Sequence, residues 1–176
     1  MKMRDNKGFT LIELLIVVAI IGIIAAIAVP GLLRARMSGN EASAIGSMRA
    51  INSAESTYSS SCGSNGYAQG LDDLVKAPAG TTQGFISPDL NVNGVTKSGY
   101  VVNVAADAGA VLVTAKANTC NAAGADAMSS YFAEAHPATI GSTGQRSFAT
   151  DTRGTIYFRN DGATIPAGMA GASVLQ

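Results

Sequence analysis

The sequence predicts an α+β fold in which one long N-terminal helix packs against an antiparallel sheet of four or five strands. Two observations carry this prediction. Residues 9–58 keep an apolar and then an amphipathic helical pattern, whereas residues 59–176 contain several short runs of β-branched and aromatic residues separated by turn residues. We therefore expect a helix over 9–58 and a globular head over 59–176.

The composition of the chain argues against several classes of function, including nucleic-acid binding and metal-dependent catalysis. Of the 176 residues, 47% are hydrophobic and only 14% are charged, against about 25% charged residues in a typical soluble domain. The 12 Lys and Arg residues balance the 12 Asp and Glu residues, which argues against a nucleic-acid partner bound along the whole surface. The single histidine, His136, excludes a metal site built from several histidines of one chain. The sequence shows no phosphate-binding glycine loop, zinc-ligand spacing or nucleophile elbow, so it predicts neither an enzyme nor a cofactor.

The first part of the helix, residues 9–29, is long and apolar enough to cross a membrane. It reads FTLIELLIVVAIIGIIAAIAV and contains 18 apolar residues among 21, with one charged residue, Glu13. As a helix it would be about 31 Å long, which matches the hydrocarbon thickness of a bilayer. Lys2, Arg4 and Lys7 precede it and predict that the N-terminus stays in the cytoplasm while the head lies outside.

An ordinary secretory signal peptide is the alternative interpretation of this N-terminus. Such a peptide also has a basic start, an apolar core and a small-residue stretch like residues 26–28. Two features oppose it. The carboxylate of Glu13 costs roughly 2.5–3.5 kcal/mol on insertion scales, less near a helix end, and a signal peptide has no use for it. The helical pattern also continues beyond Ala28.

The second part of the helix, residues 30–58, is amphipathic. Apolar residues three or four positions apart predict one buried stripe, formed by Ala42, Ile45, Met48, Ile51, Ala54 and Tyr58. Polar residues are expected on the other faces, namely Asn40, Glu41, Ser43, Ser47, Arg49, Asn52 and Glu55. A continuous helix from Phe9 to Tyr58 would span about 75 Å. Because a small head cannot cover this length, we expect the first part to project into lipid or into other subunits.

The head is expected to form the sheet. Ser, Gly, Ala and Asn become frequent after Tyr58 and end the helix, and a short helical turn is expected over 71–75. Strands are expected at 100–104, 111–115, 129–133, 146–150 and 155–159. The turn residues at 107–109 and 151–154 predict two hairpins, the first joining 100–104 to 111–115. The apolar face of the sheet is expected to cover the helix stripe.

Cys62 and Cys120 are the two cysteines of the chain, and an even number in a translocated head favours a disulfide. This bond would close a loop of roughly 58 residues and stabilise the head by about 4 kcal/mol in the chain-entropy model. Two free thiols or a metal pair are the alternatives.

Other polar residues of the head are expected to lie in solvent-exposed turns without a catalytic or metal-binding role. His136 precedes a proline and is expected to be a surface histidine in a turn. Asp72 and Asp73, and the stretch 160–162, offer oxygen atoms to a calcium ion. Neither matches a dense calcium-binding loop, so we expect solvated turns and no metal.

The string Gly8-Phe9-Thr10-Leu11-Ile12-Glu13-Leu14-Leu15 resembles the processing site of type IV pilins and of the pseudopilins of type II secretion systems. The resemblance covers residues 1 to about 58. It implies the pilin fold and a leader over residues 1–8, which a membrane prepilin peptidase would remove between Gly8 and Phe9. It also implies N-methylation of Phe9, an inner-membrane assembly platform and a helical homo-oligomeric filament.

For Glu13, with Thr10 beside it, the resemblance implies a role in setting the assembly register. An unpaired carboxylate in apolar surroundings is strongly disfavoured, and the amine of a neighbouring subunit's Phe9 would supply the missing cation. Removing one partner of a buried pair costs about 3–5 kcal/mol, so a subunit at the wrong height would be rejected. The alternative is an exposed glutamate at a helix start, favoured by the helix dipole.

Gly22 and Pro30 are expected to be the weak points of the helix. Pro30 cannot donate to the carbonyl of Ala26 and costs about 3 kcal/mol in a regular helix. Two outcomes fit equally well: the resemblance implies a stretch that unwinds within a packed filament, and a static kink that directs the head is the alternative.

The function predicted from these features is that of a structural subunit of a type IV pilus or pilus-like surface filament. It would be a single-pass precursor in the inner membrane, with the head outside the cytoplasm, and later part of a filament at the cell surface or in the periplasm. Three alternatives remain: a type II secretion pseudopilin, a minor pilin for adhesion or DNA uptake, and a membrane-tethered secreted enzyme. The DNA-binding version is disfavoured because the head lacks a basic cluster, and the enzyme because no catalytic constellation is evident.

Overall fold

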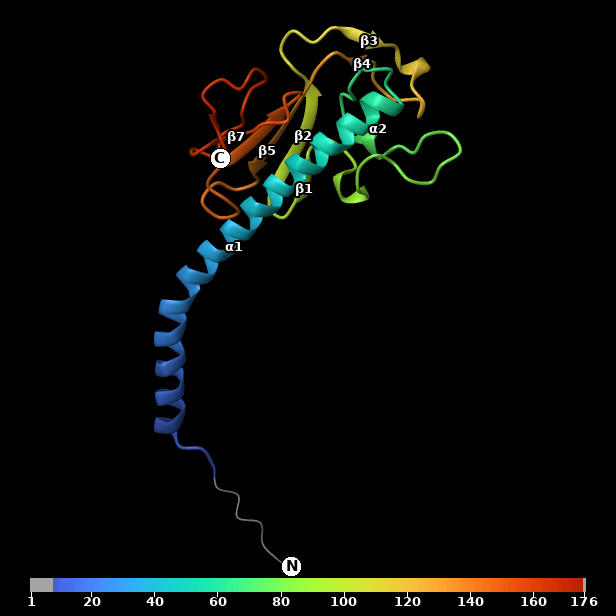
Figure 1. Cartoon of the computed structure of the whole chain (residues 1–176). Coiled ribbons are helices and arrows are strands. Elements are labelled where there is room, and N and C mark those ends of the chain that lie inside the picture. The colour runs from blue at the N-terminus through green and yellow to red at the C-terminus, as the bar shows by residue number, and fades with distance from the viewer. Residues whose placement is uncertain (1–7, 176) are drawn as a thin grey trace, which may run out of the picture. The chain divides into compact units, whose positions relative to one another are not determined.

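The computed structural model describes residues 8–175, so residues 1–7 of the predicted leader lie outside the described residues (Figure 1). The chain divides into two compact units, one ending at Arg36 and one beginning at Met37. Helix α1, Leu11–Ser61, is continuous through both. It begins two residues later and ends three residues later than the predicted span of 9–58. The short helix α2, Leu71–Val75, falls where a helical turn was expected.

The amphipathic part of α1 buries a broader face than the predicted stripe. Met48, Ile51, Ala54 and Tyr58 are buried as expected, whereas Ala42 is exposed. Ser47 and Glu55, predicted on polar faces, are buried, with Glu55 fully inaccessible. The prediction was wrong for these two because helical periodicity places both beside apolar positions, so they face the core despite their polarity.

The head contains a six-stranded antiparallel sheet in the order β1-β2-β5-β6-β7-β8. Its strands are β1 Val95–Lys97, β2 Tyr100–Ala106, β5 Tyr131–Pro137, β6 Ser147–Asp151, β7 Ile156–Arg159 and β8 Ser173–Val174. Two further strands, β3 Leu112–Thr114 and β4 Ala127–Met128, form a separate two-stranded sheet. Single 3-10 turns occur at Pro88–Leu90 and Lys116–Asn118. The α+β class is confirmed, with one strand more in the main sheet than the upper estimate.

The hairpin predicted between 100–104 and 111–115 is wrong. β2 pairs over its full length with β5, from Tyr100 opposite Pro137 to Ala106 opposite Tyr131, and β3 pairs with β4 instead. β2 buries alternate side chains, and β5 offers seven paired positions, whereas β3 spans three residues. The Asp107 side chain accepts the backbone N–H of Gly168 at 3.0 Å, which attaches the presumed hairpin turn to the C-terminal segment. The hairpin over residues 151–154 is confirmed and joins β6 to β7.

The sheet is covered on both faces. On one face the buried side of α1 packs against β2, β5 and β6 in the main core, which includes Met48, Ile51, Tyr58, Tyr100, Val102, Val104, Ala133, Ala135 and Phe148. Because side chains alternate along a strand, Phe132 points to the opposite face. There it meets Ala149 and the C-terminal residues Ile165 and Met169 in a second cluster. The sequence prediction covered only the helix-facing side.

Candidate functional site

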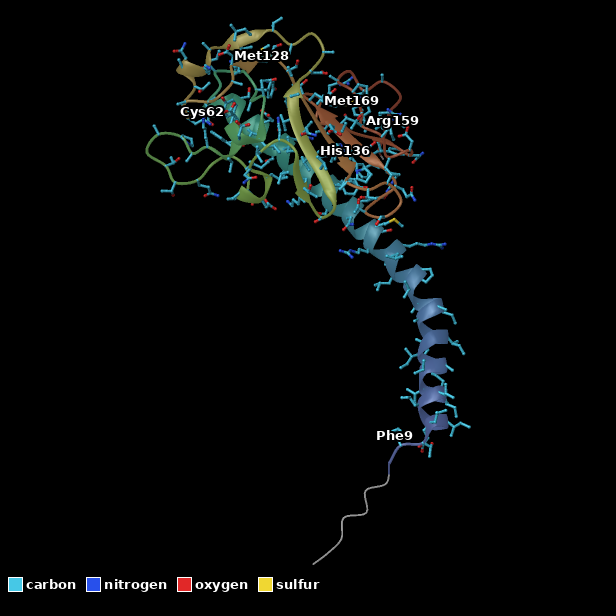
Figure 2. All side chains as sticks on the ribbon, turned by 180° about the vertical axis from the view of Figure 1, so that it is seen from behind. Phe9, Cys62, Met128, His136, Arg159 and Met169 are labelled. Atoms are coloured by element: carbon cyan, nitrogen blue, oxygen red, sulfur yellow. A yellow bond between two sulfur atoms is a disulfide. The ribbon has the colours of Figure 1, made fainter. Side chains whose placement is uncertain are left out.

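The predicted cleavage site lies in an accessible segment before α1. Gly8, Phe9 and Thr10 have no regular secondary structure, and the Phe9 side chain is 86% exposed (Figure 2). A Cβ atom added at Gly8 would meet no described atom within 4 Å. The fold of the described residues therefore does not require glycine at this position. Cleavage between Gly8 and Phe9 and methylation of Phe9 stay predictions.

Thr10 and Glu13 form a capping box at the start of α1. One Glu13 carboxylate oxygen, Oε2, accepts the backbone N–H of Thr10 at 2.9 Å and the Thr10 hydroxyl at 2.7 Å. In return, the backbone N–H of Glu13 donates to the Thr10 hydroxyl at 3.4 Å. This reciprocal arrangement satisfies donors that a helix start leaves free. The Thr-x-x-Glu spacing of residues 10–13 is a sequence signature of such a cap. Glu13 thus has an internal partner in the single chain, and its role in assembly register stays a prediction.

The first part of α1 presents apolar side chains on every side. An 18-residue window of this helix has a mean hydropathy of 3.1, and none of its residues is buried. By length and composition it qualifies as a membrane span. The large exposed residues between Leu11 and Leu33 are leucine, isoleucine and valine, and Glu13 is the one charged residue in that range. A surface of this kind requires lipid or other protein to cover it in water.

Gly22 and Pro30 do not interrupt the helix in the single chain. Pro30 lies inside α1, and the helical assignment continues on both sides of it. A Cβ atom added at Gly22 would meet no described atom within 4 Å, so packing within the chain does not demand glycine there. Unwinding of this stretch in a filament stays a prediction.

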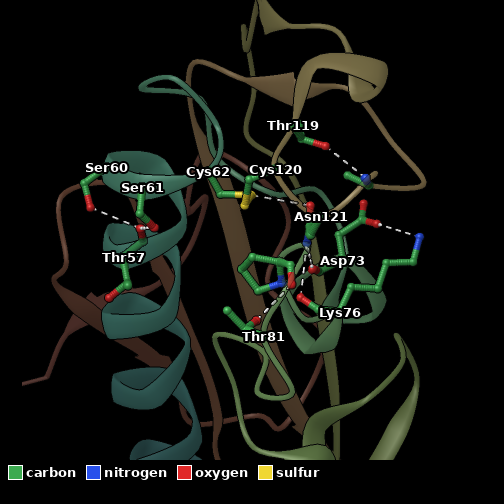
Figure 3. The surroundings of a disulfide bond; sticks show 12 residues. Thr57, Ser60, Ser61, Cys62, Asp73, Lys76, Thr81, Thr119, Cys120 and Asn121 are labelled. Atoms are coloured by element: carbon green, nitrogen blue, oxygen red, sulfur yellow. Dashed lines mark hydrogen bonds and ion pairs between the residues drawn. A yellow bond between two sulfur atoms is a disulfide. The ribbon is translucent and has the colours of Figure 1, made fainter.

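The expected disulfide between Cys62 and Cys120 is present, with the two Cα atoms 4.8 Å apart (Figure 3). Cys62 directly follows the last residue of α1. Next to Cys120, the Asn121 side-chain amide donates to the backbone carbonyls of Asp73 at 2.7 Å and Lys76 at 3.3 Å. The bond and this amide together fasten the loop at 119–121 to the end of α1 and to α2.

The remaining polar candidates serve the fold. His136 lies in β5 rather than in a turn, and its Nδ1 is 3.0 Å from Oε2 of the buried Glu134. The turn prediction was wrong because Pro137 forms the last position of the strand instead of breaking it. Asp161 accepts the backbone N–H of Ala163 and pairs with Arg159, and these donors hold the pKa of the Asp161 carboxyl below its usual value.

Asp73 was expected in a solvated turn but is buried, with 1% of its surface exposed. Its carboxylate accepts the backbone N–H groups of Gly124 at 2.5 Å and Ala125 at 3.1 Å. Within residues 8–175, no group of three or more His, Cys, Asp or Glu side chains is arranged to hold a metal ion.

Comparison with known proteins addresses the N-terminal motif directly. Residues 3–29 match the model of the prokaryotic N-terminal methylation motif. The chain is 64% identical over 39 residues to the type IV wide pilus major component of Thermus thermophilus, an alignment that covers 22% of this chain and 30% of that protein. These similarities support membership of the type IV pilin and pseudopilin family.

Two longer alignments extend the family similarity into the head. The type IV major fimbrial protein of Dichelobacter nodosus is 40% identical over 97 residues, covering 52% of this chain and 59% of the relative. The type II secretion system core protein G of Escherichia coli is 32% identical over 105 residues, covering 58% of this chain and 66% of the relative. The chain thus spans from about a third to two thirds of the length of these three relatives. No solved structure matches it significantly.

Proposed function

We propose that this chain is a structural subunit of a type IV pilus or pilus-like surface filament. It would be made as an inner-membrane precursor, cleaved after Gly8, N-methylated at Phe9 and assembled through α1. The observation that carries the proposal is the stretch from Leu11 to Leu33, an uncovered apolar helix with one carboxylate at its start. Family membership and the methylation motif support it.

The physical basis is the exchange of one apolar environment for another. Before assembly, lipid covers the helix, and Glu13 lies near one end of the span, where a carboxylate costs least. In a filament, the helices of neighbouring subunits would replace lipid around the same side chains. Apolar contact alone does not fix the axial position of one helix against another, whereas a single pairing between Glu13 and a neighbour's Phe9 amine does. The prepilin peptidase would create that amine, and an inner-membrane platform would deliver the subunits.

Mass spectrometry and negative-stain imaging of sheared surface filaments test this proposal. We expect filaments whose dominant component is this chain, beginning at N-methyl-Phe9. Filaments that lack the chain, or a chain still carrying residues 1–8 within assembled filaments, would contradict the proposal.

A second candidate is a pseudopilin of a type II protein secretion system. The observation that favours it is the 105-residue similarity to core protein G, which covers slightly more of the chain than the fimbrial alignment does. Deletion of the gene separates the two candidates. Loss of secreted exoproteins, with the chain confined to the envelope, would favour the pseudopilin, whereas loss of surface filaments with normal secretion would favour the pilus subunit.

A further inference from the structure

Glu55 is a carboxylic acid enclosed in the main core of the head. It lies on the buried face of α1, and 0% of its surface is exposed. Its Oε2 atom accepts one hydrogen bond, from the backbone N–H of Ala68 at 2.9 Å. Its Oε1 atom is buried and has no hydrogen-bond partner among the described residues. Glu55 therefore fastens the segment 62–70 to the helix through a single donor.

The groups that face Glu55 are acidic or neutral. Asp73 on α2 acts on it with a like charge, Tyr58 lies one turn further along α1, and Tyr131 faces it from β5. No cationic side chain within residues 8–175 forms an ion pair with Glu55. Lys76 pairs with Asp73 at 3.9 Å.

The two buried carboxylates of this region differ in their donors. Asp73 has two backbone N–H groups and Lys76 to stabilise a negative charge. Glu55 has one N–H group. Burying an ionised oxygen without a partner costs far more than burying an unpaired neutral hydroxyl.

We propose that Glu55 is held as a neutral acid beneath the segment Cys62–Gly70, and that this segment moves away from α1 when hydroxide removes the proton, because the ionised and unpartnered Oε1 then has to be reached by water. Burial, only partly offset by the N–H of Ala68, raises the pKa of Glu55 well above its ordinary value of 4.5, and the negative charge of Asp73 raises it further. The folded chain therefore keeps this proton at pH values where the unfolded chain has lost it. Stability contributed by the proton is complete below pH 4.5 and is lost as the pH rises toward the folded pKa.

The segment that Glu55 holds, residues 62–70, is hydrogen-bonded to the two-stranded sheet. Tyr67 and Met128 of β4 exchange two backbone hydrogen bonds, of 2.8 and 3.1 Å. Gly66 is so close to Ala127 that a Cβ atom added there would lie 2.7 Å from the Ala127 Cβ. Movement of residues 62–70 would therefore break contacts with β4 and destabilise its pairing with β3. The disulfide would keep Cys62 in place.

Thermal unfolding of the full chain in detergent micelles between pH 5 and 9.5 tests the proposal. For the wild type, we expect the melting temperature of the head, followed by near-ultraviolet circular dichroism, to fall as the pH rises. Glu55→Gln keeps the shape and the acceptor for Ala68, so it should remove this decline and melt at least about 2–4 °C above the wild type at pH 9. Equal pH slopes for the two proteins would overturn the proposal.

The matched control is Glu134→Gln. Glu134 is also buried, but its carboxylate accepts the Asn103 amide at 2.7 Å and contacts His136, so this variant should keep the wild-type slope above pH 8. Infrared spectroscopy gives a second readout that does not depend on how well a variant folds. The wild type at pH 7 should show the carbonyl band of a protonated carboxylic acid, and its absence would also overturn the proposal.

Discussion

The guanidinium group of Arg146 donates two hydrogen bonds, of 2.9 and 2.8 Å, to one carboxylate oxygen of Glu41. The other oxygen of Glu41 accepts the backbone N–H groups of Gln145 at 3.1 Å and Arg146 at 3.2 Å. The same guanidinium lies 5.5 Å from the centre of the Phe148 ring. One carboxylate on α1 thus fixes the end of the β5–β6 loop, residues 138–146, to the helix.

We expect Glu41→Ala to lower the free energy of unfolding of the head by about 2–3 kcal/mol, because hydrogen bonds to a charged group contribute about 1.5–3 kcal/mol and the donors of Arg146 would lose their acceptor. Denaturant unfolding of the full chain in detergent measures this. The control is Asp89→Ala, which removes a 2.7 Å ion pair with Lys97 in which the carboxylate side chain is 48% exposed, against 13% for that of Glu41. Its expected cost is below about 1 kcal/mol. Equal losses in the two variants would show that the Glu41 contact is no stronger than a surface pair.

Glu41, Ser47 and Glu55 show where sequence analysis of the helix stops being informative. Their apolar neighbours set the period of α1, so the helix and most of its buried stripe could be predicted from local spacing. Ser47 donates within α1, to the carbonyl of Ser43. Glu41 and Glu55 instead accept hydrogen bonds from residues outside the helix, Arg146 and Ala68. Local patterns do not contain these partners, and a polar residue without a visible partner is predicted on the surface.

The sheet shows the same limit. The β6–β7 hairpin was predictable because its turn residues adjoin both strands, and Gly154 adopts a φ of 72° that glycine readily accommodates. The pairing of β2 with β5 joins strands separated by residues 107–130, and no local signal selects it over the nearer β3. The disulfide was predictable because two cysteines allow a single pairing within the chain.

Replacing both Cys62 and Cys120 by alanine is expected to lower the free energy of unfolding of the head by about 4 kcal/mol, since the unfolded chain regains the freedom of a closed loop of roughly 58 residues. Thermal unfolding of the full chain measures the loss. The melting temperature of the wild-type protein in a reducing agent should also fall. If both keep the melting temperature of the oxidised wild type, the bond does not support the head.

Gly8→Ala tests whether glycine at position 8 is required for folding of the head or for cleavage by the prepilin peptidase. Because an added Cβ atom meets no described atom within 4 Å at Gly8, we expect unchanged folding of the head and accumulation of unprocessed precursor. Mass spectrometry of membrane fractions reports the N-terminal residue. Gly39→Ala is the matched control, since Gly39 is also free of close contacts but lies within α1. It should be processed normally, and efficient cleavage of the Gly8→Ala chain would refute a requirement for glycine before Phe9.

Glu13→Val distinguishes assembly register from helix capping. If Glu13 pairs with the Phe9 amine of a neighbour, this variant should insert into the membrane and be processed but fail to enter filaments. Loss of the capping box alone costs about 1 kcal/mol at one helix end, and Thr10→Ala removes the Thr10 hydroxyl from the same box while leaving the Glu13 charge in place. Each variant is expressed beside tagged wild-type subunits, the filaments are sheared from the cells, and the amount of variant in them is measured. We expect incorporation of Thr10→Ala to persist at a reduced level and that of Glu13→Val to be lost. Equal defects would assign Glu13 to the helix start rather than to contacts between subunits.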